Sequence, residues 1–205
     1  MNIFVNNLFS DPWLFFTVVI EVGFSVCLHE FFHAYAALKC GDPTAANAGH
    51  LTLNPLKQMG VMSIIMLLLL GFCWGAVPVN PMNLTRKKRI FVALAGVLCN
   101  LILFILGAVA TTAAYKAGAD FLSGMMLIFT QLNLVLFFIN LLPVPGFDGG
   151  AVLAEILPMH KLYSSELGKG FMLAAVLIIF YCVDYIFMIS GYITTALINF
   201  LWRIC

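Results

Sequence analysis

The sequence predicts an all-α polytopic membrane protein, a bundle of about five to six transmembrane or re-entrant helices with a short β-like loop segment. Of its 205 residues, 63% are hydrophobic and only 9% are charged, with a mean hydropathy of +1.06. A soluble core of this length cannot bury so much apolar surface. Several apolar runs also approach or exceed the roughly 20 residues with which a helix crosses a bilayer. We expect one integral membrane domain over residues 1–205.

Apolar runs give the positions of the expected helices, and breaks rich in proline and glycine separate them. The runs cover 12–39, 61–75, 90–115, 121–142, 170–189 and 191–203. The first run has no basic segment before it and no small-residue cleavage site after it, so it is expected to be retained as a helix. In the loop between the first two runs, Leu51-Thr52-Leu53 is expected to form a short strand. Residues 78–83 and 140–150 are further breaks.

Charge and cysteine usage narrow the function classes. The net charge of +1 argues against a nucleic-acid partner. The basic cluster Arg86-Lys87-Lys88-Arg89 precedes an apolar run, as cytoplasmic topology determinants do. The six cysteines show no C-x-x-C spacing, so we expect them to pack as small hydrophobic side chains.

The first apolar run contains His29-Glu30-Phe31-Phe32-His33. Positions i and i+4 share one face of a helix, so His29 and His33 can bind one zinc ion while Glu30 reaches a metal-bound water. Ionisable groups are costly inside a membrane and are usually functional there. The pattern therefore favours a hydrolytic zinc site over two histidines that merely pack in a helix bundle.

A catalytic zinc usually has three protein ligands, so a carboxylate is expected to join the two histidines. Asp148 is the strongest candidate, because two prolines end the helix before it and two glycines follow it, which frees the backbone to line a cavity. An aspartate that caps the following helix is the alternative interpretation. Glu155 is the second candidate ligand. His50 is expected to be a solvated loop histidine, and His160 to have no role.

Two motifs together resemble the paired signature of site-2 proteases, which are intramembrane zinc metalloproteases: His29-Glu-Phe-Phe-His33 and Asn140-x-x-Pro143-x-Pro145-x-x-Asp148-Gly149. Four segments between them are similar to small, single-domain members of the family without a PDZ domain: Gly41-Asp-Pro43-Thr44, Leu51-Thr-Leu-Asn54-Pro55, Pro78-Val-Asn80-Pro81 and Ala95-Gly96-x-x-x-Asn100.

The resemblance implies a set of roles for five residues. It implies that one Zn²⁺ per chain is held by His29, His33 and Asp148. It also implies that Glu30 activates the attacking water, and that Asn100 assists catalysis at the oxyanion or the substrate backbone. The implied reaction is endopeptidase cleavage of a transmembrane segment in a membrane-protein substrate, within the lipid bilayer.

A transmembrane substrate has to unwind before its scissile carbonyl can react, so a docking edge for an extended segment is expected. Residues 51–53 or 78–83 could provide it by strand addition, and plain surface loops are an equally open interpretation.

Two other functions remain open at the level of sequence. One is a catalytically inactive zinc-binding membrane scaffold or carrier, although no inverted repeat of the kind found in transporters is present. The other is a membrane metalloprotease for soluble substrates, with Glu155 as the third ligand.

The distribution of lysine and arginine predicts how the chain lies in the membrane. If the run at 61–75 crossed the bilayer, the histidine motif and Asp148 would start from opposite faces of a core ~30 Å thick. If the run is re-entrant, the ligands converge and nine of the ten basic residues fall on one side, with only Lys116 on the other; a spanning run gives seven and three. We therefore expect a re-entrant segment in a multi-pass protein of the cell membrane, with the active site open to the cytoplasm.

Overall fold

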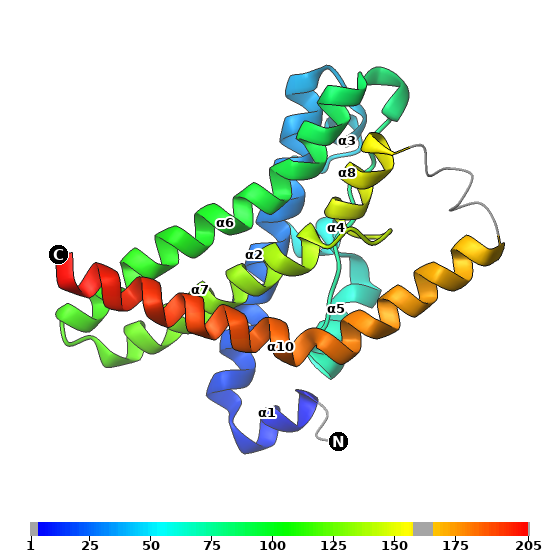
Figure 1. Cartoon of the computed structure of the whole chain (residues 1–205). Helices are drawn as coiled ribbons and strands as arrows, with labels where there is room; N and C mark the ends of the chain where they lie inside the picture. Colours follow the sequence, from blue (N-terminus) through cyan, green and yellow to red (C-terminus); the bar gives the residue numbers. More distant parts are fainter. Residues whose placement is uncertain (1–3, 158–165, 205) are drawn as a thin grey trace.

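The computed structural model describes residues 4–157 and 166–204, and all the regular elements in these residues are helical (Figure 1). In chain order they are η1 (Phe4–Asn6), α1 (Asn7–Ser10), α2 (Pro12–Cys40), α3 (Thr44–Asn47), α4 (Pro55–Gln58), α5 (Gly60–Leu70), η2 (Pro81–Asn83), α6 (Arg86–Lys116), α7 (Asp120–Leu141), α8 (Asp148–Ile156) and α10 (Glu166–Ile204). The predicted all-α class is confirmed.

Four of the described helices are long and apolar enough to cross a membrane: α2, α6, α7 and the part of α10 from Tyr181 to Ile204. Helix α2 begins where the Asp11 side chain accepts a hydrogen bond from the backbone N–H of Leu14, and it ends at Gly41 in the left-handed conformation. Helices α6 and α7 form a hairpin, and α2 and α8 both pack against α6 (Figure 1).

Helix α5 has 11 residues and is therefore about 16 Å long, roughly half of the ~30 Å hydrocarbon core. It ends at Gly71, which has a φ of 72°, and the chain then turns back along it. The hydroxyl of Ser63 donates to the carbonyl of Trp74 at 2.6 Å and accepts from its N–H at 2.8 Å. Further along, the N–H of Ala76 donates to the carbonyl of Gln58 at 3.1 Å. The chain thus returns past α4 and reaches the end of α2 again, where the N–H of Asn80 donates to the Asp42 carboxylate at 2.7 Å, as a re-entrant segment requires.

The expected strand at residues 51–53 is wrong: Leu51 and Thr52 form a bend, and Leu53 has no regular structure. The fully buried side chain of Gln58 explains the difference. Its amide nitrogen donates to the carbonyls of His50 and Thr52, at 2.8 and 2.6 Å, which takes up backbone groups that a strand would use for pairing.

The last two predicted helices, 170–189 and 191–203, are one helix, α10. A single glycine, Gly191, does not break it, and this glycine allows close contact with Gln131 of α7, whose amide donates to the carbonyl of Phe187 at 3.2 Å. Because α10 does not turn back, it ends beside the α6–α7 connection, where Lys116 Nζ lies 5.3 Å from the ring of Trp202. Arg203 therefore lies with Lys116, which corrects the expected nine-to-one distribution; Lys161 is outside the described residues.

Candidate metal centre

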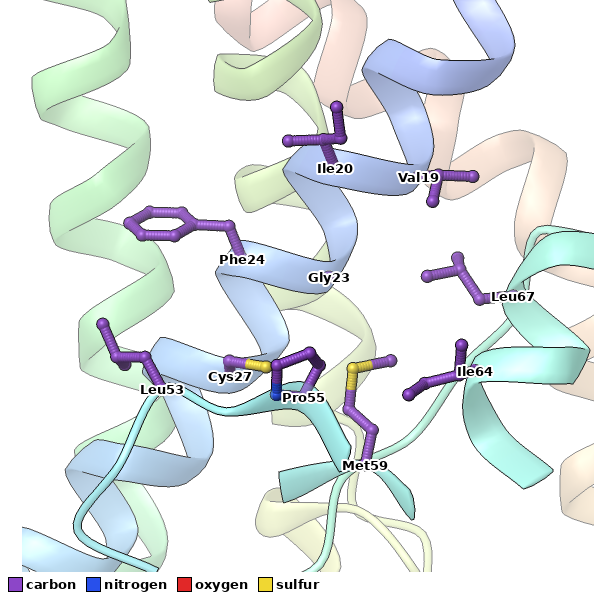
Figure 2. Close-up of a pocket in the computed structure, with 10 residues that line it drawn as sticks. All are labelled: Val19, Ile20, Gly23, Phe24, Cys27, Leu53, Pro55, Met59, Ile64 and Leu67. Atoms are coloured by element: carbon purple, nitrogen blue, oxygen red, sulfur yellow. The ribbon is translucent and has the colours of Figure 1, made fainter. Parts of the chain in front are cut away.

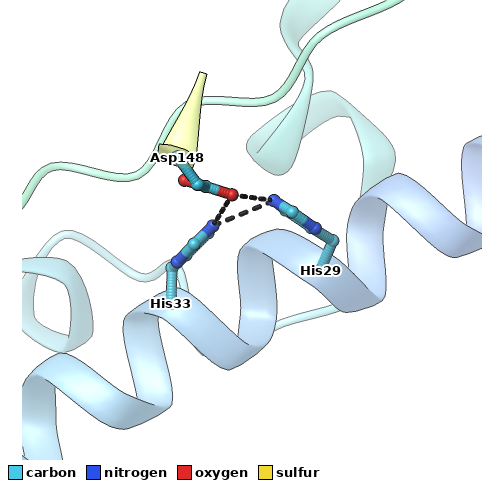
Figure 3. A group of neighbouring side chains, drawn as sticks. All are labelled: His29, His33 and Asp148. Carbon is cyan, nitrogen blue, oxygen red and sulfur yellow. Dashed lines mark hydrogen bonds and ion pairs between the residues drawn. The ribbon is translucent and has the colours of Figure 1, made fainter. Parts of the chain in front are cut away.

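Helix α2 positions three residues of the histidine motif, all of them buried. His29 and His33 lie one turn apart on the same face, and their Nε2 atoms approach to 2.9 Å (Figure 3). Glu30 is 8% exposed and follows His29 directly. The helical spacing that the sequence predicts is therefore the spacing observed.

Asp148 completes the group from a different part of the chain. It is the first residue of α8, and its Oδ2 lies 3.0 Å from Nε2 of His29 and 3.3 Å from Nε2 of His33 (Figure 3). No side chain caps α8 by a hydrogen bond, so the alternative of a capping aspartate has no support in this geometry. His29, His33 and Asp148 form the one group of metal-ligand type found in the part of the chain that the structure describes.

The hydrogen-bond partner of Nδ1 in each imidazole shows which ring nitrogen carries the proton. His33 Nδ1 lies 2.8 Å from the carbonyl oxygen of Val92, which can only accept, so Nδ1 carries the proton. His29 Nδ1 lies 2.6 Å from Oδ1 of Asn100, which likewise accepts. In neutral rings of this kind both Nε2 atoms have a bare lone pair and cannot donate to each other or to Asp148.

This arrangement fits a zinc ion. Asp148 Oδ2 is buried and has no hydrogen-bond partner among the described residues, so its short distances to the imidazoles are approaches of three acceptors. Three acceptors so close together repel one another unless a cation lies between them. Ligands about 2.0–2.1 Å from a tetrahedral zinc are roughly 3.4 Å apart, close to the distances here. Hydrogen bonding of the distal nitrogens is also what zinc-binding histidines normally show.

Two glycines allow other segments to approach the motif. A Cβ atom built on Gly96 of α6 would lie 2.6 Å from Nε2 of His29 and collide with Nε2 of His33. A Cβ on Gly75 would collide with the side chain of Glu30. Helix α6 therefore covers the two imidazoles, and the segment that returns from α5 lies against Glu30.

Asn100 lies beside the site, and both ends of its amide are engaged. The residue is fully buried; Oδ1 faces His29, and Nδ2 donates to Oδ1 of Asn133 at 3.1 Å. Asn133 in turn donates to Ser25 Oγ at 3.0 Å. Sequence reasoning singled out Asn100 but missed Asn133 and Ser25. Two features of the sequence point to them. Asn133 is a polar side chain within an apolar run, and Ser25 lies four residues before His29 on the same face of the helix.

The other candidate residues lie outside this group. Glu155 makes a bidentate ion pair with Arg89, at 2.7 and 2.8 Å, and is not among the converging ligand atoms. His50 Nδ1 lies 3.2 Å from Oε1 of Gln58, so this histidine is partly buried in its loop rather than fully solvated. His160 is outside the described residues.

An apolar cavity of about 300 Å³ lies between α2, the 53–55 loop and α5 (Figure 2). Val19, Phe24, Cys27, Met59 and Leu67 are among the residues that line it. None of the three candidate metal ligands contributes to its wall, so the cavity is distinct from the metal centre even though Cys27 is only two residues before His29.

The fold and the site together define a class: a polytopic membrane protein whose candidate metal ligands, two histidines and an aspartate, come from helices. No protein-family model and no solved structure matches the chain. The chain is 37% identical over 158 residues to the "Putative zinc metalloprotease YwhC" of Bacillus subtilis, with 72% of this chain and 70% of that protein aligned. It is 36% identical over 177 residues to a protein of the same description, Rip2 of Mycolicibacterium smegmatis, with 81% and 68% aligned.

These relatives cover enough of both chains to establish the family. The chain belongs to the site-2 protease family. It is a zinc metalloprotease, and Zn²⁺ is its metal.

Proposed function

We propose that this zinc metalloprotease is an intramembrane endopeptidase that cleaves transmembrane segments of membrane proteins. The observation that carries the proposal is the convergence of His29, His33 and Asp148 beside a helix long enough to cross the bilayer. His29 lies ten residues, or about 15 Å, along α2 from Lys39 near the helix end. A bond hydrolysed at that depth belongs to a substrate that is itself in the membrane.

In this proposal His29, His33 and Asp148 hold one zinc ion, and Glu30 is the general base. Zinc, when bound, supplies Lewis-acid chemistry that polarises a carbonyl and lowers the pKa of water. The Glu30 carboxylate takes a proton from the attacking water and passes it to the amine nitrogen as the peptide bond breaks. Glu30 lies on the same turn of α2 as His29, and Gly75 leaves its side chain just enough room.

The segment after α5 is a suitable docking edge for an unwound substrate. Residues 72–79 have no regular structure and alternate between exposed and half-buried side chains, which is the pattern of an extended strand. At Gly75 this segment lies against Glu30. The edge covers residues 72–79 rather than the expected 78–83, because Pro81–Asn83 forms a 3-10 helix and ends the extended segment. A substrate that added as a strand here would bring its backbone past the general base.

Orientation follows from the basic residues. Lys39 and the cluster at the start of α6 lie at one end of the helix bundle, where Lys88 Nζ donates to the carbonyl of Cys40 at 2.7 Å, whereas Lys116 and Arg203 lie at the other end. By the positive-inside rule the larger group faces the cytoplasm. We infer that the enzyme is in the cell membrane and that its active site opens toward the cytoplasm.

Glu30→Gln tests the proposed mechanism. The purified variant should retain one zinc per chain and lose cleavage of a transmembrane peptide in proteoliposomes. Glu21→Gln is the matched control, because Glu21 is also a buried glutamate of α2 and should tolerate the change with cleavage retained. Cleavage by Glu30→Gln would contradict the proposed base. A wild-type protein that binds zinc and cleaves no membrane peptide would instead favour the scaffold or carrier.

A further inference from the structure

A chain of buried side-chain amides connects His29 to the interior of α7. It runs from His29 to Asn100 on α6 and from Asn100 to Asn133 on α7, and it ends at Ser25, one turn before His29 on α2. Ser25, Asn100 and Asn133 are each fully buried, so solvent has no access to complete or exchange these hydrogen bonds.

The donor-to-acceptor direction of this series of hydrogen bonds is fixed at its α7 end. Asn133 Nδ2 lies 3.0 Å from the backbone carbonyl of Phe129, and a carbonyl can only accept a hydrogen bond. The amide nitrogen of Asn133 must therefore face Phe129, where its second hydrogen reaches Ser25 Oγ at 3.0 Å. Its oxygen is consequently turned toward Asn100.

The orientation of Asn133 then determines which nitrogen of His29 carries the proton. Because Asn133 presents an oxygen, Asn100 has to present Nδ2 to it, at 3.1 Å. Asn100 therefore turns its own oxygen toward His29 Nδ1, at 2.6 Å, and the proton of the imidazole has to be on Nδ1. The other nitrogen, Nε2, is left bare and faces Asp148.

Asn100 alone could not impose this form. An amide rotated by 180° has nearly the same shape and would present a donor to Nδ1, which would move the imidazole proton to Nε2, the atom that faces the metal centre. His33 has no such ambiguity, since a backbone carbonyl, that of Val92, accepts from its Nδ1.

We propose that Asn133 is a positioning residue that fixes the tautomer of His29 through Asn100. The inference rests on the proposed role of His29 as a metal ligand. Asn133 contacts neither the metal centre nor the substrate edge; it acts by keeping the Asn100 amide in the orientation that leaves His29 Nε2 free to bind zinc.

The test compares zinc affinities by chelator competition in detergent, together with the visible spectrum of the cobalt-substituted protein. Asn133→Leu keeps the side-chain size but removes the amide that orients Asn100. Zinc binding should therefore weaken by about ten- to a hundredfold, the usual effect of losing a hydrogen bond that supports a metal ligand. Thr130→Val is the matched control: Thr130 is also fully buried on α7, one turn earlier, and its hydroxyl lies 3.2 Å from that of Thr111. It should leave the zinc affinity unchanged.

A rescue separates positioning from a general packing defect. Asn100→Asp introduces a side chain that has no N–H to offer His29, so it needs no orienting partner. Added to Asn133→Leu, it should restore zinc affinity and the cobalt spectrum to near the wild type. If Asn133→Leu does not fold, Asn133→Ala serves for the same comparison.

Wild-type zinc affinity in folded Asn133→Leu, or a double variant as weak as Asn133→Leu, would overturn the proposal. His29→Ala in the same assay tells its failure from that of the proposed site. If His29→Ala loses zinc and Asn133→Leu does not, only the positioning role fails; if His29→Ala keeps wild-type affinity, the metal site itself is wrong.

Discussion

At the scale of single residues, the candidate metal ligands and Glu30 could be predicted from the sequence, but the residues that orient them could not. His29, Glu30 and His33 lie within five residues, and Asp148 follows a helix-ending pair of prolines. These local patterns are enough to indicate a zinc site. The orientation of His29 depends instead on Asn133, which is brought near only by the packing of three helices. A single sequence does not specify that packing.

Gly96 is a second residue whose role only the structure reveals. In Gly96→Ala the added methyl carbon would lie 2.6 Å from Nε2 of His29 and displace the imidazole pair. We expect zinc affinity to fall at least about tenfold, as for other disturbed metal-site supports. Helix propensity alone would favour alanine by about 1 kcal/mol, so a loss cannot come from that source.

Gly23→Ala is the control for this substitution, since a Cβ there meets only Leu67 at 4.0 Å. Zinc titration of both variants measures the difference. Equal, wild-type zinc affinity in the two would show that Gly96 has no steric role at the centre.

At the scale of elements, short helix α8 is held in place by the start of α6. Arg89 pairs with Glu155, and Arg86 donates to the carbonyl of Ile156 at 2.9 Å. Sequence reasoning took this basic cluster only as a topology determinant, because its partners are some 66 to 70 residues away. The cluster also anchors the helix that begins with Asp148.

Glu155→Gln should lower the melting temperature of the protein only slightly, because the ion pair is partly exposed. The loss should shrink in about 1 M salt, where surface ion pairs are screened. Lys87→Gln removes an exposed charge from the same cluster and is the control. Thermal unfolding at two salt concentrations measures the effect, and a loss that is equal at both would argue against an electrostatic role.

Asp42 organises the loop between α2 and the returning segment. Its carboxylate accepts from the backbone N–H of Asn80 at 2.7 Å, from Nδ2 of Asn83 at 2.8 Å, and from the N–H and hydroxyl of Thr44. Burial opposes ionisation, but these hydrogen bonds outweigh it and hold the pKa of Asp42 below its usual value. The sequence showed only a Gly-Asp-Pro turn, since Asn80 and Asn83 lie about 40 residues further on.

A lowered pKa in the folded state means that Asp42 stabilises the protein fully above its unfolded pKa of about 3.9, and that this contribution disappears as the pH falls through the folded value. Asp42→Asn should therefore destabilise the protein by about 1–3 kcal/mol at neutral pH, since it places an amide donor against donors. The variant should also lose less stability than the wild type between pH 4 and pH 2, as measured by denaturation at each pH. Parallel pH curves would contradict this.

The interruption at Ser190 and Gly191 shows why element boundaries were harder to predict than elements. The predicted helices 170–189 and 191–203 left a boundary at Ser190, yet Ser190 and Gly191 both lie within α10. Contact of Gly191 with the Gln131 side chain of α7 accounts for the small residue at that place, and no single sequence distinguishes such a contact from a break.

At the scale of the whole molecule, the metal site and the membrane topology depend on each other. The predicted return of the chain near residues 61–75 agrees with an α5 of only 11 residues and with the hydrogen bond from Ala76 back to Gln58. The predicted charge distribution was wrong for Arg203, because a helix of 39 residues ends far from where it begins.

Single cysteines introduced at Lys57 and Met82 in a cysteine-free protein test this topology. Both positions are exposed and flank the returning segment, so membrane-impermeant reagents should label them from the same face. A cysteine at the exposed Ala117, in the α6–α7 connection, should be labelled from the other face. Labelling of positions 57 and 82 from opposite faces would rule out a re-entrant segment.

The central claim, that His29, His33 and Asp148 bind the zinc ion, is tested most directly by the zinc content of the purified protein and its variants. Wild type and Glu155→Ala should contain one zinc per chain, whereas His29→Ala and Asp148→Ala should contain almost none. Unchanged zinc in Asp148→Ala, or loss of zinc in Glu155→Ala, would contradict the assignment.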